Sequence, residues 1–176
     1  GHKTLLVTSN INNIADMPCN PSIGGPAKGI VVREIDALGG EMGKNADKAA
    51  LQTKMLNTKK GPAVQALRFQ ADKIIYPKEM LKTLNSTQNL EIKEAMVEKL
   101  LVKDKKIEGV ELEDGEKILA SAVILTTGTY LKAVVLKGAT RKSSGPHGEK
   151  ESKYLSDSLK ELGFTIKRLK TGTPQR

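Results

Sequence analysis

Near residue 90 the apolar residues stop recurring at the helical period and begin to alternate with polar ones, a change that limits the possible folds more than any other feature of the sequence. Upstream, an apolar stripe ends at Gly39-Gly40, which predicts a helix over 26–38. Downstream, the alternation predicts an antiparallel β-meander over about 90–120. Its expected strands are 90–94, 97–103, 107–113 and 116–119, with turns at 104–106 and 114–115.

Further elements are expected on both sides of this change. Residues 3–8 are typical of a short buried strand. A helix is expected after Gly61-Pro62, with its apolar stripe running to Ile75 and its end or kink at Pro77. Towards the carboxyl end, the sequence predicts a helix with Ser152 as its N-cap and Gly163 as its stop, and a strand over 164–169.

An apolar run over 122–125 ends abruptly at Thr126-Thr127-Gly128. Such a run predicts a strand buried on both faces that ends at a site. The order of elements then predicts an α/β fold of the doubly wound, Rossmann-like kind, with the meander inserted before the last parallel strand. Folds of this kind bind ligands beyond the carboxyl ends of the parallel strands, where Thr8 and Thr126–Thr129 would lie.

The expected fold lacks one part of a dinucleotide site, its first strand and glycine-rich turn. The sequence has no Gly-x-Gly-x-x-Gly fingerprint, and Gly24-Gly25 is no substitute because its spacing is wrong and no strand closely precedes it.

The segment Cys19–Gly29 is a glycine- and proline-rich loop that is expected to run into a helix beginning at Pro26. The N–H groups of Ala27, Lys28 and Gly29 would then be free to meet an anion or the electron-rich edge of a cofactor. The helix start and Lys28 could lower the pKa of the Cys19 thiol and make it a nucleophile. An ordinary loop with a buried, inert thiol fits the residues of this loop equally well.

Length and composition favour one globular domain with its own core, and the charge is unevenly spread. The net charge is +9, and residues 132–176 hold eleven Lys or Arg against four acidic residues, a net of +7. A basic face could bind RNA, with Lys167, Arg168, Lys170 and Arg176 as the candidates for phosphate contacts, although a solvated lysine-rich surface is the competing interpretation. One Cys and two His give no disulfide and no metal-ligand spacing, and no signal peptide or membrane span is recognisable, so a cytoplasmic protein is expected.

Six blocks of the sequence, taken in order, resemble the MnmG (GidA) family of bacterial FAD-dependent tRNA wobble-uridine modification enzymes. The blocks are Cys19–Gly25, Val32–Met42, Met55–Asn57, Lys60–Arg68, Thr126–Leu131 and Leu169–Pro174. The resemblance implies that this chain is an internal piece of the FAD-binding region, with the missing strand and turn before residue 3 and further segments after Arg176. We expect this piece alone to be inactive and to hold FAD poorly.

For the full-length enzyme, the resemblance implies FAD as cofactor, NADH and methylenetetrahydrofolate as co-substrates, and a homodimer that works with the GTPase MnmE. Such an enzyme adds a carboxymethylaminomethyl or aminomethyl group to the wobble uridine of tRNA, with glycine or ammonium as donor. The resemblance divides the chain into an incomplete FAD-binding domain over 1–131 and the start of a basic segment over 132–176, which could belong to an inserted second domain.

The resemblance also implies roles for individual residues. Cys19 would attack or otherwise activate the uridine ring, and Val97 would contact adenine through its backbone. Thr126, Thr127, Gly128 and Thr129 would border the pyrophosphate and ribityl chain of FAD. The residues expected to face the flavin ring are Asn20, Pro21, Ser22, Ile23, Gly24 and Gly25.

Three basic residues outside the carboxyl-terminal segment are further candidates for the tRNA substrate. Lys28 and Arg33 could bind phosphate or uridine, or form ion pairs on a helix surface. Arg68 could line the substrate pocket or be an ordinary surface arginine. Two other functions stay open: a folate- and FAD-dependent tRNA uridine methyltransferase, and a non-enzymatic RNA-binding module.

Overall fold

The computed structural model describes residues 1–17, 20–145, 148–170 and 172. Contacts divide the chain into two compact units, unit 1 over 1–6 and 10–92, and unit 2 over 7–9 and 93–176. The division passes through strands β1 (Thr4–Thr8) and β5 (Leu90–Glu94), which pair with each other. Thr4 N–H donates to Asn89 and Ala95 N–H donates to Thr8, so residue numbers rise together along the pair and it is parallel. Both strands were expected from the sequence.

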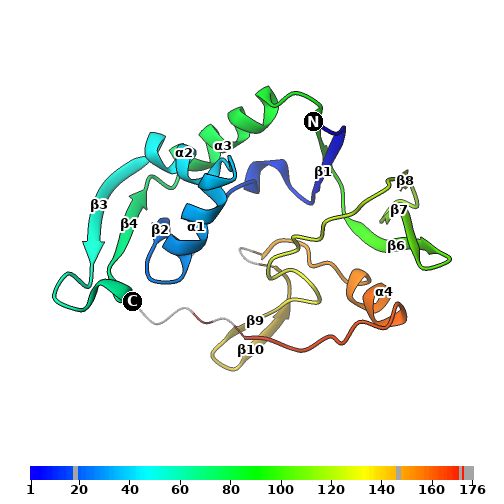
Figure 1. The fold of residues 1–176 in the computed structure, drawn as a ribbon. Helices are drawn as coiled ribbons and strands as arrows, with labels where there is room; N and C mark the ends of the chain where they lie inside the picture. The colour runs from blue at the N-terminus through cyan, green and yellow to red at the C-terminus, as the bar shows by residue number, and fades with distance from the viewer. Residues whose placement is uncertain (18–19, 146–147, 171, 173–176) are drawn as a thin grey trace. The chain divides into compact units, whose positions relative to one another are not determined.

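Unit 1 contains a three-stranded antiparallel sheet in the order β2 (Ser22–Gly24), β4 (Ala66–Ala71), β3 (Ala50–Leu56) (Figure 1). In the register, Gly24 faces Arg68 and Phe69 lies between Ile23 and Thr53. The sequence pattern did not indicate β2 or β3.

The prediction of a helix directly after Gly61-Pro62 is wrong. That segment forms a 3-10 turn, η2 (Pro62–Val64), then strand β4, and only then helix α3 (Ile75–Ser86). Pro77 is the third residue of α3, where a backbone N–H has no partner within the helix, so proline neither kinks nor ends it. The Asp72 carboxylate accepts hydrogen bonds from Ile74 N–H at 2.8 Å and Ile75 N–H at 2.9 Å and so starts the helix.

The helix expected over 26–38 is confirmed as α1, with the bounds Lys28–Ala37. Gly39 has a φ of +85°, and its N–H donates to Asp36 while that of Gly40 donates to Ile35, which closes the helix as expected. Two further helical segments belong to unit 1, α2 (Met42–Lys48) and the 3-10 turn η1 (Ile11–Asn13).

The core of unit 1 lies where α2 and α3 meet the sheet. Its buried residues are Ile23, Ala46, Ala49, Ala71 and Tyr76. Burial raises the pKa of the Tyr76 phenol. Asn45 is fully buried among them, donates to the Glu41 carbonyl at 2.9 Å and accepts from the Thr83 hydroxyl at 2.9 Å.

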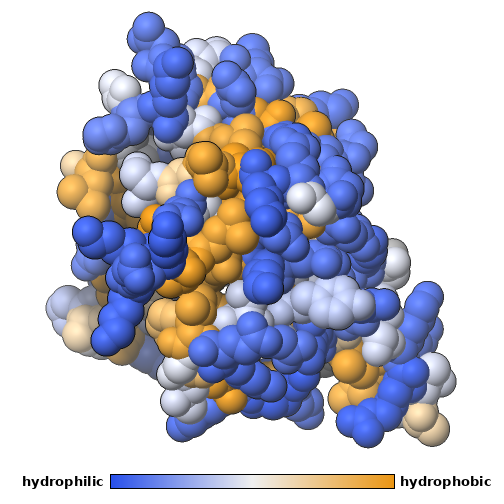
Figure 2. All heavy atoms as spheres, turned by 90° about the vertical axis from the view of Figure 1, so that its right-hand side faces the viewer, coloured by the Kyte–Doolittle hydropathy of each residue, from blue (hydrophilic) through white to orange (hydrophobic). Residues whose placement is uncertain are grey.

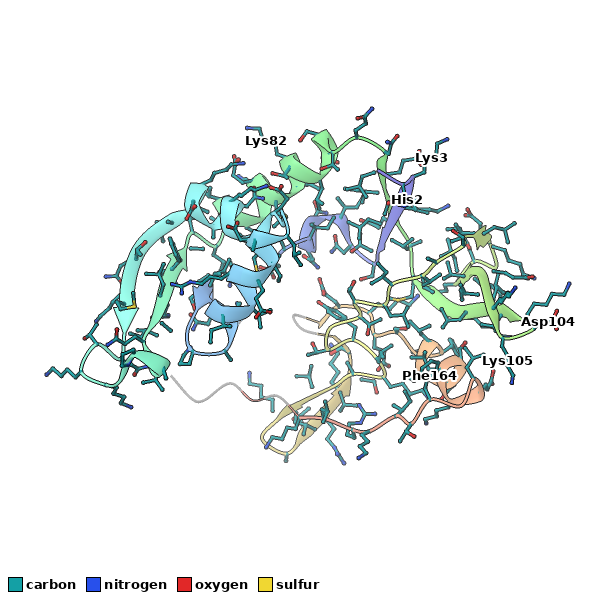
Figure 3. The ribbon with its side chains drawn as sticks, in the orientation of Figure 1. His2, Lys3, Lys82, Asp104, Lys105 and Phe164 are labelled. Atoms are coloured by element: carbon teal, nitrogen blue, oxygen red, sulfur yellow. The ribbon has the colours of Figure 1, made fainter. Side chains whose placement is uncertain are left out.

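Unit 2 contains three of the four strands expected for the meander, β6 (Val97–Lys103), β7 (Lys106–Leu112) and β8 (Lys117–Leu119), in antiparallel order. The inclusion of residues 90–94 is wrong, because that strand, β5, pairs with β1 instead. Lys103 pairs with Lys106, so the β6–β7 turn consists of Asp104 and Lys105. Both have positive φ, as a two-residue hairpin turn requires, and both are labelled at the tip of that hairpin in Figure 3.

The rest of unit 2 comprises the hairpin β9 (Val134–Lys137) and β10 (Thr140–Ser143) and helix α4 (Leu155–Glu161). Helix α4 contacts β6 through Ser158, whose hydroxyl accepts from Leu100 N–H at 3.1 Å, and Leu155 is buried. Gly163, with a φ of +90°, follows the helix as expected. Ser152 is not its N-cap, since Tyr154 holds that position and Ser152 forms an isolated parallel bridge with Leu131.

Two expected strands of unit 2 are absent from the described residues. Residues 122–128 are irregular, and Ile124 is 87% exposed, so the expectation of a strand buried on both faces is wrong for this chain. Residues 164–169 are also irregular and exposed. Apolar composition does not make a strand unless a neighbouring strand supplies hydrogen bonds, and neither segment has such a neighbour in the described part of unit 2. The doubly wound arrangement and the domain division at 131/132 stay predictions.

Hydrophobic surface is open to solvent in both units. Figure 2 shows such surface on one face, bordered by hydrophilic side chains. Exposed examples in unit 2 are Leu119, Ile124, Phe164 and Leu169, and Phe164 is labelled in Figure 3. None of the helices in the described ranges combines the length and apolar composition needed to cross a bilayer.

Candidate functional site

The predicted flavin-facing loop, Asn20–Gly25, is held against strand β4 of unit 1. The Pro21 carbonyl accepts from Ala71 N–H at 2.7 Å and from the Gln70 side chain at 3.2 Å. After it, β2 pairs with β4, and Gly25 N–H donates to the Leu67 carbonyl at 3.1 Å. The loop is therefore fixed along most of its length by one neighbouring strand.

Glycine is required in this loop by close backbone approach. Gly24 has a φ of +135°, and a Cβ there would lie 2.1 Å from the Leu67 carbonyl oxygen. Gly25 differs, because a Cβ there would meet no atom within 4 Å. The open space expected at both glycines is therefore found at Gly25 and not at Gly24, and the approach of a ligand to Gly25 stays a prediction.

Two of the predicted cationic residues lie against the same loop. The Lys28 ammonium donates to the Ser22 carbonyl at 2.9 Å. Arg68 donates to the Gln70 side chain at 3.1 Å and to the Asn20 side chain at 3.4 Å. Their hydrogen bonds therefore support the loop, and the remaining N–H groups of each cation are available to an anion.

Arg33 is exposed on α1 and makes no ion pair with the described residues, so the alternative of a helix-surface ion pair is not found. Cys19, the predicted nucleophile, lies outside the described residues.

The helix start beside the loop differs from the prediction. Helix α1 begins at Lys28 rather than Pro26, and its first N–H groups are not all free. Gly29 N–H donates to the Gly25 carbonyl at 2.9 Å. The anion site expected at Ala27, Lys28 and Gly29 is therefore wrong in this detail, because one of its three donors is already used.

In unit 2, the chain brings Thr8 near the start of β6. The Thr8 carbonyl accepts from Ala95 N–H at 2.8 Å, two residues before Val97, and Val97 is half-buried at the first position of the strand. The adjacent Met96 carbonyl accepts from Glu113 N–H at 2.9 Å. Two predicted cofactor residues far apart in the sequence thus lie in one part of the unit.

The predicted Thr126–Thr129 segment forms a turn in unit 2. Tyr130 N–H donates to the Thr127 carbonyl at 3.2 Å, and Gly128 has a φ of +55°. The next residues run beside Ser152: Ser152 N–H donates to Tyr130 at 3.0 Å, and Lys132 N–H donates to Ser152 at 2.8 Å. The turn is therefore tied to the segment that precedes α4. Thr126 and Thr129 are exposed and Thr127 is half-buried.

Sequence reasoning missed two hydroxyl groups here. Ser152 and Ser156 are buried, and neither hydroxyl has a hydrogen-bond partner in the described structure. A buried hydroxyl without a partner is costly, so each is a candidate to receive a polar group of a ligand. No sequence signal marks them, because serines just before a helix or in its first turn are equally typical of caps.

The basic candidates of the carboxyl-terminal segment differ in their contacts. Lys167 and Lys170 are exposed, whereas Arg168 donates to the Lys132 carbonyl at 2.9 Å. Lys132 in turn pairs with Asp157 at 2.7 Å, and the hydrogen bond from Lys132 holds the pKa of that carboxyl below its usual value. Arg176 lies outside the described residues.

Within the described ranges, no group of three or more His, Cys, Asp or Glu side chains is arranged to hold a metal ion. The groups that could meet a ligand are instead hydroxyls, backbone N–H groups and cations. This donor set suits an organic anion or a nucleotide.

These observations define a mixed α/β protein with parallel and antiparallel sheets, whose polar loops carry the candidate binding groups. The chain belongs to the family described as Glucose inhibited division protein A, whose model matches residues 1–176.

Relatives and solved structures agree with this assignment. The chain is 57% identical over 173 residues to the tRNA uridine 5-carboxymethylaminomethyl modification enzyme MnmG of Acholeplasma laidlawii, covering 98% of this chain. It is also 57% identical over 176 residues to the MnmG of Geobacillus thermodenitrificans, covering all of this chain. In both comparisons it spans 28% of the relative's length.

Among solved structures, Aquifex aeolicus GidA in its form I crystal matches with a TM-score of 0.92 and 48% identity, over 98% of this chain and 29% of that one. The GidA-related protein from Thermus thermophilus matches with a TM-score of 0.53 and 15% identity, over 93% of this chain and 69% of that one, which is a likeness of fold alone.

Proposed function

We propose that this chain is the flavin-holding part of an enzyme that adds a carboxymethylaminomethyl or aminomethyl group to the wobble uridine of tRNA. The observation that carries the proposal is the 57% identity, over essentially the whole chain, to two relatives named as tRNA uridine 5-carboxymethylaminomethyl modification enzymes. The fixed loop of unit 1 and the hydroxyl-bearing turn of unit 2 support it.

The residues present fit FAD as the cofactor. The buried, unpartnered hydroxyl of Ser152, whose backbone bonds to Tyr130 directly after the Thr126–Thr129 turn, is the observation that favours a polar ligand there. Thr126, Thr127, Gly128 and Thr129 would border the pyrophosphate and ribityl chain, with Ser152 as an added donor. Thr8 and the backbone of Val97 would contact the nucleotide end. FAD, when bound, would supply the electron-transfer chemistry of the reaction.

The loop of unit 1 would face the flavin ring and the uridine. Asn20, Pro21, Ser22, Ile23, Gly24 and Gly25 would form the wall against the ring. Arg68 positions this wall through its bonds to Asn20 and Gln70, and Lys28 through its bond to Ser22. Cys19, which directly precedes the wall in sequence, would supply the thiol that attacks or activates the uridine.

Cations of both units would hold the tRNA backbone. Lys28, Arg33, Arg68, Lys167, Arg168, Lys170 and Arg176 are the proposed contacts, because phosphate recognition needs positive charge. NADH and methylenetetrahydrofolate would be the co-substrates, the GTPase MnmE and a second copy of the enzyme the protein partners, and the cytoplasm the place of action.

The test is nucleoside analysis by mass spectrometry of tRNA from a strain that lacks the gene. Restoring the gene should restore the modified wobble uridine, whereas Cys19→Ser should not, although flavin absorbance of the purified variant stays normal. Glu161→Gln, an exposed change at the end of α4, is the control and should behave like the wild type.

Two other results would overturn the proposal. Loss of ribothymidine in place of the wobble nucleoside would assign the chain to a folate- and FAD-dependent methyltransferase. An unchanged set of nucleosides, together with salt-dependent tRNA binding that needs no flavin, would assign it to an RNA-binding module.

A further inference from the structure

Tyr130 directly follows the Thr126–Thr129 turn, and its main chain holds that turn in place. Its N–H donates to the Thr127 carbonyl at 3.2 Å, and its carbonyl accepts from Ser152 N–H at 3.0 Å. Apart from Thr127, the residues of the turn are exposed, so burial contributes little to the conformation of the turn. The position of the turn therefore depends on how firmly Tyr130 is held.

The side chain of Tyr130 is anchored at a second place in unit 2. Its hydroxyl donates to the Glu149 carboxylate at 2.5 Å, and both residues are half-buried. A hydrogen bond to a charged acceptor is stronger than one between neutral groups. Glu149 is fixed in turn, because its carbonyl accepts from Gly145 N–H at 2.8 Å.

Gly145 makes room for the ring of Tyr130. Gly145 is buried, and a Cβ there would lie 2.6 Å from Cε1 and 2.7 Å from Cδ1 of the ring. Any other residue type at this position would require the ring to move. The ring is thus confined along one edge by the Gly145 backbone and at its tip by Glu149, so two contacts fix the conformation of the Tyr130 side chain.

The Tyr130 hydroxyl is poorly suited to react with a ligand itself. A tyrosine hydroxyl has one proton to donate, and that of Tyr130 is already given to Glu149. What the side chain supplies instead is a fixed end for the turn that precedes it. A segment that is already ordered binds a ligand with a smaller loss of conformational entropy.

We propose that Tyr130 is a positioning residue, whose hydrogen bond to Glu149 holds the Thr126–Thr129 turn ready for the pyrophosphate and ribityl chain of FAD. The inference rests on the proposed function, which assigns those groups of FAD to the turn. Neither side chain has to touch the cofactor, so the pair acts on the affinity for FAD through the conformation of the turn.

The test is titration of the apoprotein, as its gene encodes it, with FAD, followed by the quenching of flavin fluorescence. Tyr130→Phe keeps the ring and removes the hydroxyl, and Glu149→Ala removes the acceptor. Each should raise the dissociation constant of FAD about tenfold, as expected when one hydrogen bond to a charged group is lost. Glu149→Gln retains an acceptor oxygen and should restore part of the affinity. Tyr154→Phe, the same substitution at a tyrosine that is 56% exposed, is the matched control and should leave the constant unchanged.

Two further readouts distinguish positioning from a general loss of stability. The double variant, with Tyr130→Phe and Glu149→Ala together, should bind FAD no more weakly than either single variant, because all three lack the same hydrogen bond. The amount of FAD bound per chain at saturation should stay that of the wild type. A variant that is merely part unfolded would instead bind less FAD per chain with an unchanged dissociation constant.

The outcomes separate failure of this inference from failure of the proposed function. An unchanged dissociation constant in Tyr130→Phe, additive losses in the double variant, or a fall in bound FAD per chain alone overturns the inference and leaves the proposed function standing. If the wild type itself takes up no FAD, the proposed function fails and the inference falls with it.

Discussion

Gly24 is the single residue on which the loop of unit 1 depends most. A Cβ at this position would lie 2.1 Å from the Leu67 oxygen and 2.6 Å from the Arg68 Cα, so the two strands would have to separate. Gly24→Ala should therefore lower the free energy of unfolding by about 2 kcal/mol or more. Urea denaturation followed by circular dichroism would measure it, since the chain has no Trp to report by fluorescence.

The chain offers a matched control for this substitution. Gly61 has an ordinary φ of −60°, and a Cβ there meets nothing within 4 Å. Gly61→Ala should change the free energy of unfolding by no more than about 0.5 kcal/mol. Equal effects of the two alanines would mean that close approach of the backbone is not what requires glycine at position 24.

Asn45 is the residue whose burial most depends on its hydrogen bonds. Its side chain is fully buried, donating to Glu41 and accepting from Thr83. Asn45→Ala leaves the Thr83 hydroxyl without its acceptor and should cost about 1–3 kcal/mol in unfolding free energy. Asn12→Ala, at an exposed position, is the control in the same denaturation experiment. A loss no larger than that of Asn12→Ala would rule out a structural role for the buried amide.

Residue identities in the candidate site could be named from the sequence, but their partners could not. Glycines, prolines and cations around residues 20–28 indicate a binding loop because few other roles need that combination. That Arg68 would bond to Asn20, 48 residues away, depends on strand pairing that no local pattern records. The unpartnered hydroxyl of Ser152 was missed because polar residues before a helix look the same whether they are solvated or buried.

Among the elements, the start of helix α3 is expected to respond to pH through Asp72. Hydrogen bonds from the N–H groups of Ile75 and Ile74 hold the pKa of Asp72 below its ordinary value of 3.8. A carboxyl with a lowered pKa in the folded state stabilises the fold above that ordinary value, and its contribution is lost as the pH falls below it. We expect Asp72→Asn to unfold at a lower temperature than the wild type near neutral pH, with the two midpoints converging in acid.

Asp72→Ala is the control for this prediction, because Asn can still accept a hydrogen bond at a helix start and Ala cannot. The alanine variant should remain less stable than the wild type in acid as well. Thermal midpoints measured by circular dichroism across the acidic range decide the matter. A constant difference between Asp72→Asn and the wild type over that range would show that the charge of Asp72 contributes nothing.

Among the antiparallel strands, those joined by tight turns were predictable, and those of the β2–β4–β3 sheet were not. The meander β6–β7–β8 followed from alternation because each strand pairs with the next along the chain. Strand β4 was mistaken for helix because its apolar residues also fit a helical stripe. One of its partners, β2, lies far earlier in the chain, and the other, β3, is joined to it through the 3-10 turn η2 rather than through a tight hairpin turn. The expected strand at 122–128 shows the converse error, where apolar composition was taken to imply a partner.

For the molecule as a whole, the net charge of +9 raises the question whether RNA binding needs placed cations or only total charge. Lys167 and Lys170 are exposed and form no ion pair with described residues, and the same holds for Lys103 and Lys105 on the meander. Substituting Gln for either pair removes the same charge.

If the proposed phosphate contacts are made, the variant at Lys167 and Lys170 alone should lower the magnitude of the slope of log K for tRNA against log salt by about 1.5, because fewer counterions are released from the RNA when two contacts are lost. The meander variant should shift affinity slightly and keep the slope. Equal slopes in the two variants would mean that total charge, rather than the segment after α4, governs binding.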